Sequence, residues 1–363
     1  MILIFLSVRL PKDCRKVKPS PDEHIILAVR IAGDISKPAM LVSVVVPNLN
    51  KGQYLQECLE SIIRQDYAEV EIIAVDGGSS DNSIEIFEKY RSHLSELIVE
   101  QDNGQAHAIN KGFRKSSGEI VTWLNSDDIF LPDAINTVVE TFTENPSLDL
   151  MYGNGLFIDE RSRALRAFIE VEPYDRYRLL NCSDYIMQPT AFYRRRALEQ
   201  IGYLDETLHF AFDWDLWCKL ALLSDSVQYV QPFIAATRIY PSTKTASGSW
   251  TRLKEINHVL RRHRTRLLPP AIWGYLAYEL ESKRHSSAGP TKYLMGLLCW
   301  FCALLGIENT LHDRRLRHSG RAIDALPFTE LPDGFVLPNH VKNINTLSPD
   351  EIRLRLLKED NSG

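Results

Sequence analysis

Two adjacent aspartates stand directly after an apolar segment that is typical of a buried β-strand. The strand spans Ile120–Leu124, and the polar residues that follow it are Asn125, Ser126, Asp127 and Asp128. Polar residues at the carboxyl end of such a strand project into the crevice where open α/β sheets bind ligands. Since Mg²⁺ and Mn²⁺ prefer oxygen ligands and usually bring phosphates with them, the cluster predicts a divalent-cation site.

A second interpretation of the same cluster involves no metal. Pro132 suits the first turn of a helix, and Asp127 or Asp128 would then cap that helix from a solvated loop. In the first interpretation a cation offsets the repulsion between the two carboxylates, and in the second it is screened by water.

The composition indicates a globular protein and argues against a general nucleic-acid binder. The chain has 363 residues, 44% of them hydrophobic, which is enough for one large domain or two moderate ones. Its formal net charge is −5 and its pI is near 6.1. General affinity for nucleic acids comes mostly from neutralising phosphates, so we expect no nucleic-acid partner.

The six cysteines favour buried thiols. Only Cys299 and Cys302 form a CxxC pair, which lies inside the apolar segment 293–307 and has no second CxxC to complete a zinc site. Free cysteines are among the most frequently buried residues. A reducing, cytoplasmic location follows as an expectation.

Three segments are relevant to whether the protein contacts a membrane. Residues 1–6 are too few for the apolar core of a signal peptide, and 293–307 is shorter than the roughly 20 residues that a spanning helix needs. The latter is either a buried core helix or an interfacial one. Basic residues at 261–266 precede aromatic and apolar ones, which suits either an anionic membrane surface or a solvated turn. A peripheral contact at the cytoplasmic membrane face is therefore one expectation.

From Leu41 onward, strand and helix patterns alternate. The apolar spacing predicts strands at 41–46, 70–75, 97–99 and 120–124, with helices at 54–63, 84–90 and 106–114. This alternation predicts an α/β fold with a doubly wound, mostly parallel central sheet flanked by helices. After Pro146 the alternation loosens, with strands at 148–152 and 156–158, and after Pro241 the chain turns helical and basic.

The loops that follow the predicted strands are polar but carry no phosphate-binding glycine motif. Neither GxGxxG nor GxxxxGK[ST] occurs, which argues against ordinary dinucleotide and P-loop enzymes. A nucleotidyltransferase would need a basic, glycine-rich signature that 48–52 does not supply. Asp76, after the second strand, would accept hydrogen bonds from a base or ribose, or would merely open the Gly77-Gly78 turn. Asp127 would hold a metal that carries a diphosphate.

A set of motifs, in this order, resembles the inverting family 2 glycosyltransferases, which have the nucleotide-diphospho-sugar transferase (GT-A) fold. The motifs lie at 42–50, 74–83, 102–112, 123–128, 188–195 and 212–217. Each is weak alone, and together they are specific. The resemblance divides the chain into an N-terminal extension at 1–40, a nucleotide-sugar-binding half at 41–145, an acceptor-binding half at 146–240, and a helical C-terminal extension with its tail at 241–363.

The resemblance also implies roles for individual residues. The donor would be bound by Pro47, Asn48, Asn50, Asp76, Gln105, Asn110, Asn125 and Ser126. Among these, Asp76 would bind the uracil or other base, and Gln105 and Asn110 would face the nucleotide or donor sugar. Asp127 matches the last acid of the family's Asp-x-Asp motif and would hold Mn²⁺ or Mg²⁺. Asp213 occupies the place of the catalytic base, with Asp215 as the second candidate.

The chain departs from the family pattern at three positions. Asn125 replaces the first acid of the metal motif, Phe212 replaces the glutamate beside the base, and Tyr240 replaces a histidine that reaches the metal or diphosphate in many relatives. Arg238 or Lys244 would compensate by contacting the diphosphate. The apolar Phe212 would raise the proton affinity of Asp213 by desolvation. The other interpretation is a helix whose tryptophans pack while Asp213 and Asp215 face water.

We therefore expect an inverting glycosyltransferase. It would move a sugar from a nucleoside-diphosphate sugar, with UDP as the expected nucleotide, to a hydroxyl of a glycan or lipid-linked acceptor in cell-surface polysaccharide synthesis. Asp213 would take the hydroxyl proton, and a divalent ion at Asp127 would stabilise the leaving diphosphate. The alternative, motivated by the three departures, is a nucleotide-sugar-binding protein of the same fold with weakened catalysis.

Overall fold

The computed structural model describes residues 39–168, 170–240, 243–244, 249–263, 269–276, 280 and 297–298. The cysteine pair at 299 and 302, the extension before residue 39 and the tail lie outside these residues, as does the apolar segment 293–307 except for Leu297 and Leu298, which are exposed. The description below concerns the described part of the unit that begins at Met40.

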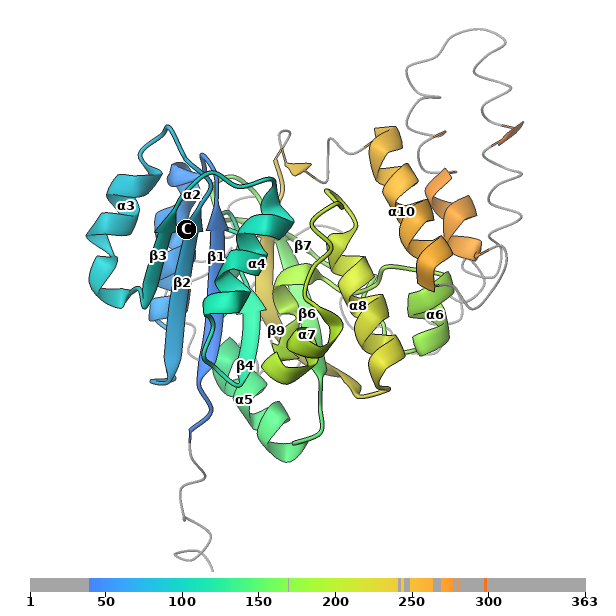
Figure 1. Ribbon diagram of the computed structural model, residues 1–363, viewed down its shortest axis with the longest axis horizontal. Helices are drawn as coiled ribbons and strands as arrows, with labels where there is room; N and C mark the ends of the chain where they lie inside the picture. Colours follow the sequence, from blue (N-terminus) through green and yellow to red (C-terminus); the bar gives the residue numbers. More distant parts are fainter. Residues whose placement is uncertain are drawn as a thin grey trace, which may run out of the picture. The chain divides into compact units, whose positions relative to one another are not determined.

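Nine strands form one mixed sheet in the order β3-β2-β1-β4-β8-β6-β9-β5, with β7 paired to β6 (Figure 1). The strands are β1 (Val42–Asn48), β2 (Val70–Asp76), β3 (Glu96–Val99), β4 (Ile120–Trp123), β5 (Ile129–Phe130), β6 (Leu150–Ile158), β7 (Ala164–Ala167), β8 (Phe192–Arg194) and β9 (Val227–Arg238). The four strands from β3 to β4 are parallel, as the alternation of strands and helices predicts. The pairings of β8 with β4 and β6 are antiparallel, as are β5 with β9 and β7 with β6, whereas β6 and β9 are parallel.

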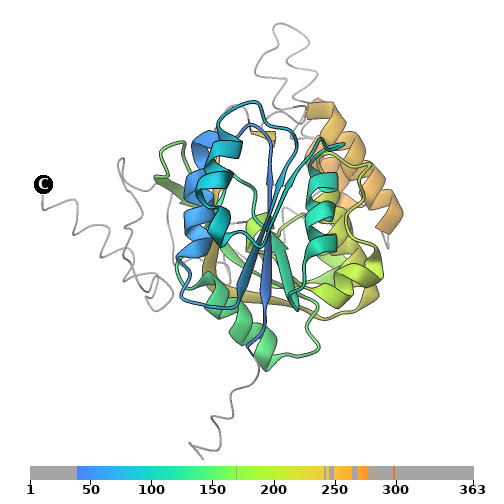
Figure 2. The ribbon, with the colours of Figure 1, turned by 60° about the vertical axis from the view of Figure 1, so that its left-hand side comes forward.

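Helices cover both faces of this sheet (Figure 2). They are α2 (Gly52–Ile63), α3 (Ser83–Lys89), α4 (Gln105–Lys115), α5 (Ala134–Glu144), α6 (Arg176–Asn181), α7 (Arg195–Ile201), α8 (Phe212–Leu223) and α10 (Ser249–His263), with short 3₁₀ turns at Arg91–His93 and Gln188–Thr190. The blue and cyan helices α2 and α3 lie on one side of the strands, and α4 and α8 lie on the other. The predicted doubly wound architecture is therefore confirmed.

Alternate residues of β1 divide the core into two layers. Val44 and Val46 pack with the apolar face of α2, whereas Val45 packs with α4 and with the tryptophans of α8. This follows from the period of two along a strand, which sends successive side chains to opposite faces. Each fully buried side chain such as Leu55 of α2 contributes about 1.5–3 kcal/mol relative to exposure.

One glycine brings α4 close to the sheet. A Cβ atom on Gly112 would lie 2.3 Å from Cγ1 of Val45, a distance that no side chain allows. Because α4 begins at Gln105, this close contact fixes the height of its first turn above the carboxyl ends of the strands.

The structure differs from the sequence-based expectations after residue 123. The strands expected at 148–152 and 156–158 are one continuous strand, β6, paired along its length with β9. The helix expected near Pro132 begins at Ala134, and its N-cap Asp133 makes no side-chain capping bond. Strand β5 lies between this helix and the acidic cluster, so neither Asp127 nor Asp128 caps it.

Candidate active site

The loops after β1 and β2 meet at the carboxyl edge of the sheet through Asp76. Its Oδ2 accepts from Asn48 Nδ2 at 2.7 Å and from Ser79 Oγ at 2.7 Å, and its Oδ1 accepts from the backbone N–H groups of Gly78 at 3.0 Å and Ser79 at 2.7 Å. Asp76 is fully buried, and Gly78 has a φ of +92°. The carboxylate thus organises the turn, as the simpler interpretation expects, and its contact with a base stays a prediction.

The three other residues predicted for the nucleotide pocket stand around this turn. Pro47 and Asn48 end β1 beside Val75 and Asp76 of β2. Asn50 has a φ of 54°, donates its N–H to Ser79 Oγ at 2.9 Å, and accepts from the N–H of Ser80 at 2.7 Å. Within the described residues, Asn48 Oδ1 is a buried acceptor with no hydrogen-bond partner. An unpaired buried acceptor is costly, so this oxygen is suited to a donor group of a ligand.

Asp127 lies in the loop after β4 and is bound by two groups from distant segments. Its Oδ2 accepts from Tyr240 Oη at 2.5 Å and lies 3.3 Å from Lys51 Nζ, which also contacts Tyr240 Oη. The Lys51 ammonium lies 4.6 Å from the centroid of the Tyr240 ring. Tyr240 therefore reaches the carboxylate that was predicted to hold a metal, and Lys51 places a positive charge beside it.

A divalent ion fits at Asp127 only if the donor's diphosphate supplies further ligands. Among the described residues no group of three or more His, Cys, Asp or Glu side chains comes together. Mg²⁺ is commonly bound by one or two carboxylates plus substrate phosphates, and the half-buried Asp127 can supply one such ligand. The fit therefore requires the donor's diphosphate, and the ion must compete with Lys51 for Asp127.

A chain of amides runs from this loop across the edge of the sheet. Gln105 Nε2 donates to Asn125 Oδ1 at 2.7 Å, and Asn125 Nδ2 donates to Gln188 Oε1 at 3.0 Å. At the other end, Lys244 Nζ donates to Gln105 Oε1 at 2.9 Å. Gln105 at the start of α4 and Asn125 in the loop after β4 thus contact each other, and the buried Ser126 follows Asn125 in that loop. Their contacts with the donor stay a prediction.

Asp128 is a buried residue of the loop rather than a helix cap. Its Oδ1 accepts from the backbone N–H of Arg238 at 3.0 Å, and its Oδ2 accepts from Asn125 Nδ2 at 3.1 Å. Burial, assisted by the charge of Asp127, raises the pKa of Asp128 to about 8. At neutral pH this carboxyl is largely protonated.

Arg238 joins this loop to the rest of the fold. Its buried guanidinium donates to Glu57 Oε2 at 2.7 Å, to the carbonyl of Asp159 at 2.8 Å, to Ser162 Oγ at 2.9 Å and to the carbonyl of Asp127 at 3.0 Å. The predicted diphosphate contact would require it to leave these partners. The geometry instead gives Arg238 the role of a clamp between β9 and the acidic loop.

Asp213 lies in the first turn of α8. Its Oδ1 accepts from the backbone N–H of Trp214 at 2.8 Å. Burial raises the pKa of Asp213 to about 6, although the nearby charge of Lys244 opposes the shift. The Asp184 carboxyl is close enough to interact with it, and burial together with the charge of Asp213 raises the pKa of Asp184 well above its usual range. Asp213 is therefore a carboxylate whose proton affinity suits a general base near neutral pH.

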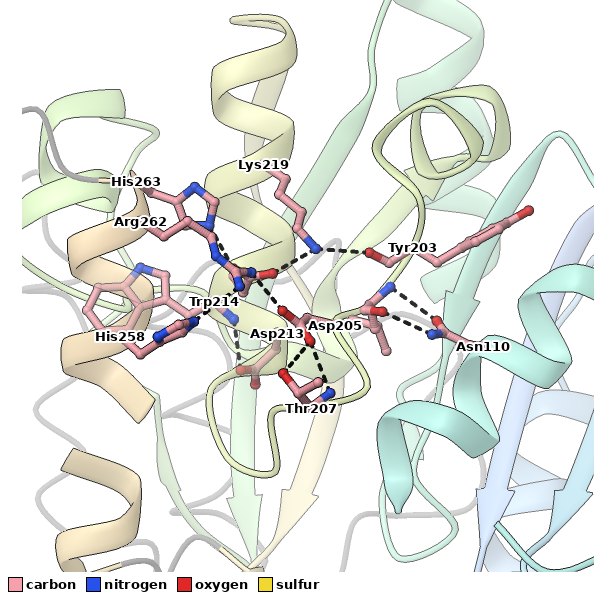
Figure 3. Close-up of polar contacts among 12 residues, drawn as sticks. Asn110, Tyr203, Asp205, Thr207, Asp213, Trp214, Lys219, His258, Arg262 and His263 are labelled. Atoms are coloured by element: carbon pink, nitrogen blue, oxygen red, sulfur yellow. Dashed lines mark hydrogen bonds and ion pairs between the residues drawn. The ribbon is translucent and has the colours of Figure 1, made fainter. Parts of the chain in front are cut away.

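Asp215, two residues further along α8, is an internal anchor. Its carboxylate is fully buried and lies 2.8 Å from Lys219 Nζ, 2.7 Å from His263 Nε2 and 3.2 Å from Arg262 (Figure 3). Although burial opposes ionisation, the hydrogen bonds from His263 and Lys219 hold the pKa of Asp215 below its usual value. The interpretation in which both aspartates face water is wrong for Asp215. With both oxygens bound by cations, Asp215 is also poorly suited to take a substrate proton.

Asn110 lies away from the polar edge of the sheet. Its Nδ2 donates to the carbonyl of Leu204 at 3.0 Å, and its Oδ1 accepts from the N–H of Leu204 at 3.1 Å (Figure 3). Its Nδ2 also donates to Glu206 Oε1 at 2.8 Å. Asn110 is buried, and both ends of its amide are used. The structure therefore uses it to attach the 204–206 segment to α4, and the predicted donor contact has no geometric support.

Comparison with known proteins agrees with this geometry. The sequence model described as "Glycosyl transferase family 2" matches residues 43–202. A PGL/p-HBAD biosynthesis glycosyltransferase of Mycobacterium tuberculosis is 30% identical over 181 residues, which are 49% of this chain and 68% of that protein. The chain belongs to glycosyl transferase family 2. An uncharacterized glycosyltransferase of Rickettsia prowazekii is 28% identical over 224 residues, covering 59% of this chain and 69% of that protein.

The fold of this family 2 glycosyltransferase is also similar to a solved structure. The crystal structure of Staphylococcus aureus TarS residues 1–349 in complex with UDP-GlcNAc has a TM-score of 0.51 and 17% identity, and the match covers 77% of this chain and 92% of that one. At this identity the likeness concerns the fold, and it confirms the GT-A architecture. Within the described residues, no helix is both long and apolar enough to cross a membrane.

Three residues of the site were missed by sequence reasoning about this glycosyltransferase. Gln188 stands inside a recognised motif, so its place beside Asn125 had a signal, whereas Lys51 and Asp184 had none. For the basic segment at 261–266, the sequence suggested either an anionic membrane surface or a solvated turn. Arg262 lies 2.7 Å from Asp205 and 3.2 Å from Asp215, so it contacts the protein itself, and residues 264–266 lie outside the described residues.

Proposed function

We propose that this family 2 glycosyltransferase is an inverting enzyme that uses a nucleoside-diphosphate sugar and that Asp213 is its general base. The setting of Asp213 carries this proposal, because a half-buried carboxylate with a pKa raised to about 6 is suited to accept a proton near neutral pH. Lys244 lies beside it and donates to Gln105, which contacts Asn125. The base thus stands next to the amide chain that leads to the Asp127 loop.

The reaction is a single displacement. Asp213 takes the proton of an acceptor hydroxyl while that oxygen attacks the anomeric carbon from the face opposite the leaving group. The bond between the anomeric carbon and the phosphate oxygen breaks, and its electron pair leaves with the nucleoside diphosphate. The configuration at the anomeric carbon is inverted, and no covalent enzyme intermediate is required.

Asp127 would hold the divalent ion, Mn²⁺ or Mg²⁺, together with the donor's diphosphate. When bound, the ion supplies positive charge to the leaving group. Lys51 contributes a second positive charge 3.3 Å from Asp127, and Tyr240 orients the same carboxylate through its hydroxyl. These two residues hold Asp127 in one position before the donor arrives, which lowers the cost of organising the site.

The donor pocket is assigned to the turn around Asp76 and to the amides that follow β4. Asn48 Oδ1 offers an unpaired buried acceptor there, and Asn50 stands at its rim. UDP is the first nucleotide to test, since the TarS crystals hold UDP-GlcNAc. We place the acceptor among glycans or lipid-linked saccharides of the cell surface, a proposal that the name of the M. tuberculosis relative supports. The enzyme would act in the cytoplasm.

A binding protein with weakened catalysis is the second candidate. The contacts of Lys51 and Tyr240 with Asp127 favour it, because they occupy an oxygen that a divalent ion would otherwise use. It predicts that nucleotide sugars bind without release of nucleoside diphosphate.

The test is a panel of UDP-, GDP- and dTDP-sugars, each with and without Mn²⁺ or Mg²⁺, offered with a mixture of glycan and lipid-linked acceptors. Thermal stabilisation measures binding, release of nucleoside diphosphate measures turnover, and NMR of the new glycosidic bond gives its configuration. An enzyme of the proposed kind releases nucleoside diphosphate and inverts the anomeric centre. Stabilisation without release would select the binding protein, and a retained configuration would refute the single displacement.

A further inference from the structure

Helix α10 reaches the catalytic region through Glu255. Its Oε1 and Oε2 each accept from the N–H of His209 at 3.0 Å, and its Oε2 also accepts from the N–H of Phe210 at 2.6 Å and of Ala211 at 3.2 Å. Glu255 is half-buried. One carboxylate thus holds three consecutive backbone N–H groups of a segment that belongs to no helix or strand.

That segment leads directly into the first turn of α8. Ala211 is the N-cap of the helix, and its carbonyl accepts from the N–H of Asp215 at 3.0 Å. Asp213 lies between these two residues, so the position of Ala211 fixes the peptide that carries the proposed base. A negative charge just before a helix N-terminus is also favoured by the helix dipole.

The far end of α10 is attached to the same helix. His263 Nε2 and Arg262 contact the buried carboxylate of Asp215, and Arg262 also binds Asp205 at 2.7 Å (Figure 3). Between the two ends, buried residues of α10 pack in the same core as Trp214 of α8. Figure 1 shows α10 alongside α8. Because α10 is fixed at both ends, Glu255 is held in a defined place.

We infer that Glu255 is a positioning residue for the transfer reaction, which sets the place and the charge environment of Asp213 from a helix beyond the segment that the family model matches. This inference rests on the proposed role of Asp213. Glu255 acts through the backbone of His209 to Ala211 and touches no substrate.

The charge of Glu255 gives the inference a readout that a purely structural contact lacks. Burial is the main cause of the raised pKa of Asp213, and the negative charge of Glu255 adds to it, whereas Lys244 lowers it. The other titratable groups that interact with Asp213 are Asp184, Tyr193 and Tyr275. Removing the Glu255 charge therefore lowers the pKa of the base, so that activity persists to lower pH.

The experiment compares Glu255→Gln and Glu255→Asp with Glu199→Gln, a matched control on α7 whose exposed carboxylate pairs with Arg195. For each variant of the full chain, kcat, the donor KM and the pH dependence of kcat are measured with the nucleotide sugar that the panel identifies. We expect Glu255→Gln to lower kcat about 10- to 100-fold with little change in KM, since small misplacements of a reacting group have effects of this size. In the same variant, the acid limb of the pH profile of kcat should move to lower pH.

Glu255→Asp retains the charge but shortens the side chain, so it should lower kcat while leaving the acid limb near its original pH. Glu199→Gln should behave as the unchanged protein. The inference is overturned if Glu255→Gln retains kcat within about twofold, or if its kcat falls only in proportion to the folded fraction seen by thermal melting with no shift of the acid limb. If Glu255→Gln does not fold, the kcat of Glu255→Asp decides in the same way.

Asp213→Asn separates this inference from the proposed function. If Asp213→Asn abolishes turnover while Glu255→Gln behaves like the Glu199→Gln control, the base assignment stands and the positioning role is wrong. If Asp213→Asn retains turnover, the proposed function fails first, and the positioning role of Glu255 fails with it.

Discussion

The Asp127–Asp128 loop and the start of α8 each carry two aspartates. The two regions differ in the charge of the buried aspartate. In both, one carboxyl is half-buried and has a proposed role in the reaction, and the other is buried as part of the scaffold. The buried Asp128 receives hydrogen bonds from a backbone N–H and an amide, and its pKa is raised to about 8. The buried Asp215 receives Lys219, Arg262 and His263, and its pKa is lowered.

The difference teaches that burial alone does not set the charge of an acid. Burial disfavours ionisation in both regions, and the partners decide the outcome. Cations hold Asp215 ionised, whereas neutral donors beside the charged Asp127 leave Asp128 protonated. The two half-buried members, Asp127 and Asp213, also differ in the charge of their neighbours. Asp127 has Lys51 at 3.3 Å, and Asp213 has the carboxyl of Asp184 as a neighbour.

The largest expected effect is the loss of the base. Asp213→Asn keeps the size of the side chain but removes its ability to take a proton, so kcat should fall about 10³-fold, within the range for general bases. Binding of UDP, followed by calorimetry, should stay within about twofold because the proposed partner of Asp213 is the acceptor hydroxyl and not the nucleotide. Equal losses of kcat in Asp213→Asn and Asp215→Asn at full folding would break the proposed division of roles.

Removal of the anchor should act on stability instead. Asp215→Asn leaves Lys219 and Arg262 without their buried counter-charge and removes the carboxylate that His263 contacts, and we expect the free energy of unfolding to fall by about 3 kcal/mol. Urea unfolding measures this loss, with the exposed Asp66→Asn as the matched control. A variant that unfolds like the control would show that the three basic side chains do not depend on Asp215.

The protonated state of Asp128 predicts a pH dependence of stability. Its folded-state pKa of about 8 lies above the unfolded value of 3.8, so the stability it contributes is complete below pH 3.8 and is lost as pH rises through about 8. Asp128→Asn cannot ionise, and between pH 5 and pH 9 it should lose less stability than the unchanged protein by about 1 kcal/mol or more. Parallel urea-unfolding profiles for the two proteins would show that Asp128 is ionised throughout.

The smallest expected effect concerns Lys51. Lys51→Met keeps the length of the side chain and removes the cation that competes for Asp127, so Mn²⁺ should bind about two- to fivefold more tightly in the presence of UDP, as for a partly exposed ion pair. Calorimetric titration of the UDP-bound protein measures this change, with Lys254→Met on the exposed side of α10 as the control. Weaker binding of Mn²⁺ by Lys51→Met would show that the ammonium supports the ion rather than competes with it.

The fold was largely predictable from local patterns. The alternation of strands and helices from Leu41 to Leu124 predicts the parallel half of the sheet, because periods of 2 and 3.6 report which face each residue buries. The pairing of β6 with β9 was not predicted, because two strands and three α-helices separate them along the chain and periodicity does not record which strands pair. Strand β5 is only two residues long and has no periodicity to detect.

The sequence by itself determined which residues follow the carboxyl ends of the strands, and therefore the edge of the sheet at which Asn48 contacts Asp76 and Gln105 contacts Asn125. Only the tertiary structure decided what each acid does. Each of Asp128, Asp127 and Asp215 has a partner far along the chain, 110, 113 and 48 residues away, at Arg238, Tyr240 and His263. Ionisation depends on burial and on such distant charges, which no local pattern records, so two adjacent or nearly adjacent aspartates of equal appearance acquire different roles when the chain folds.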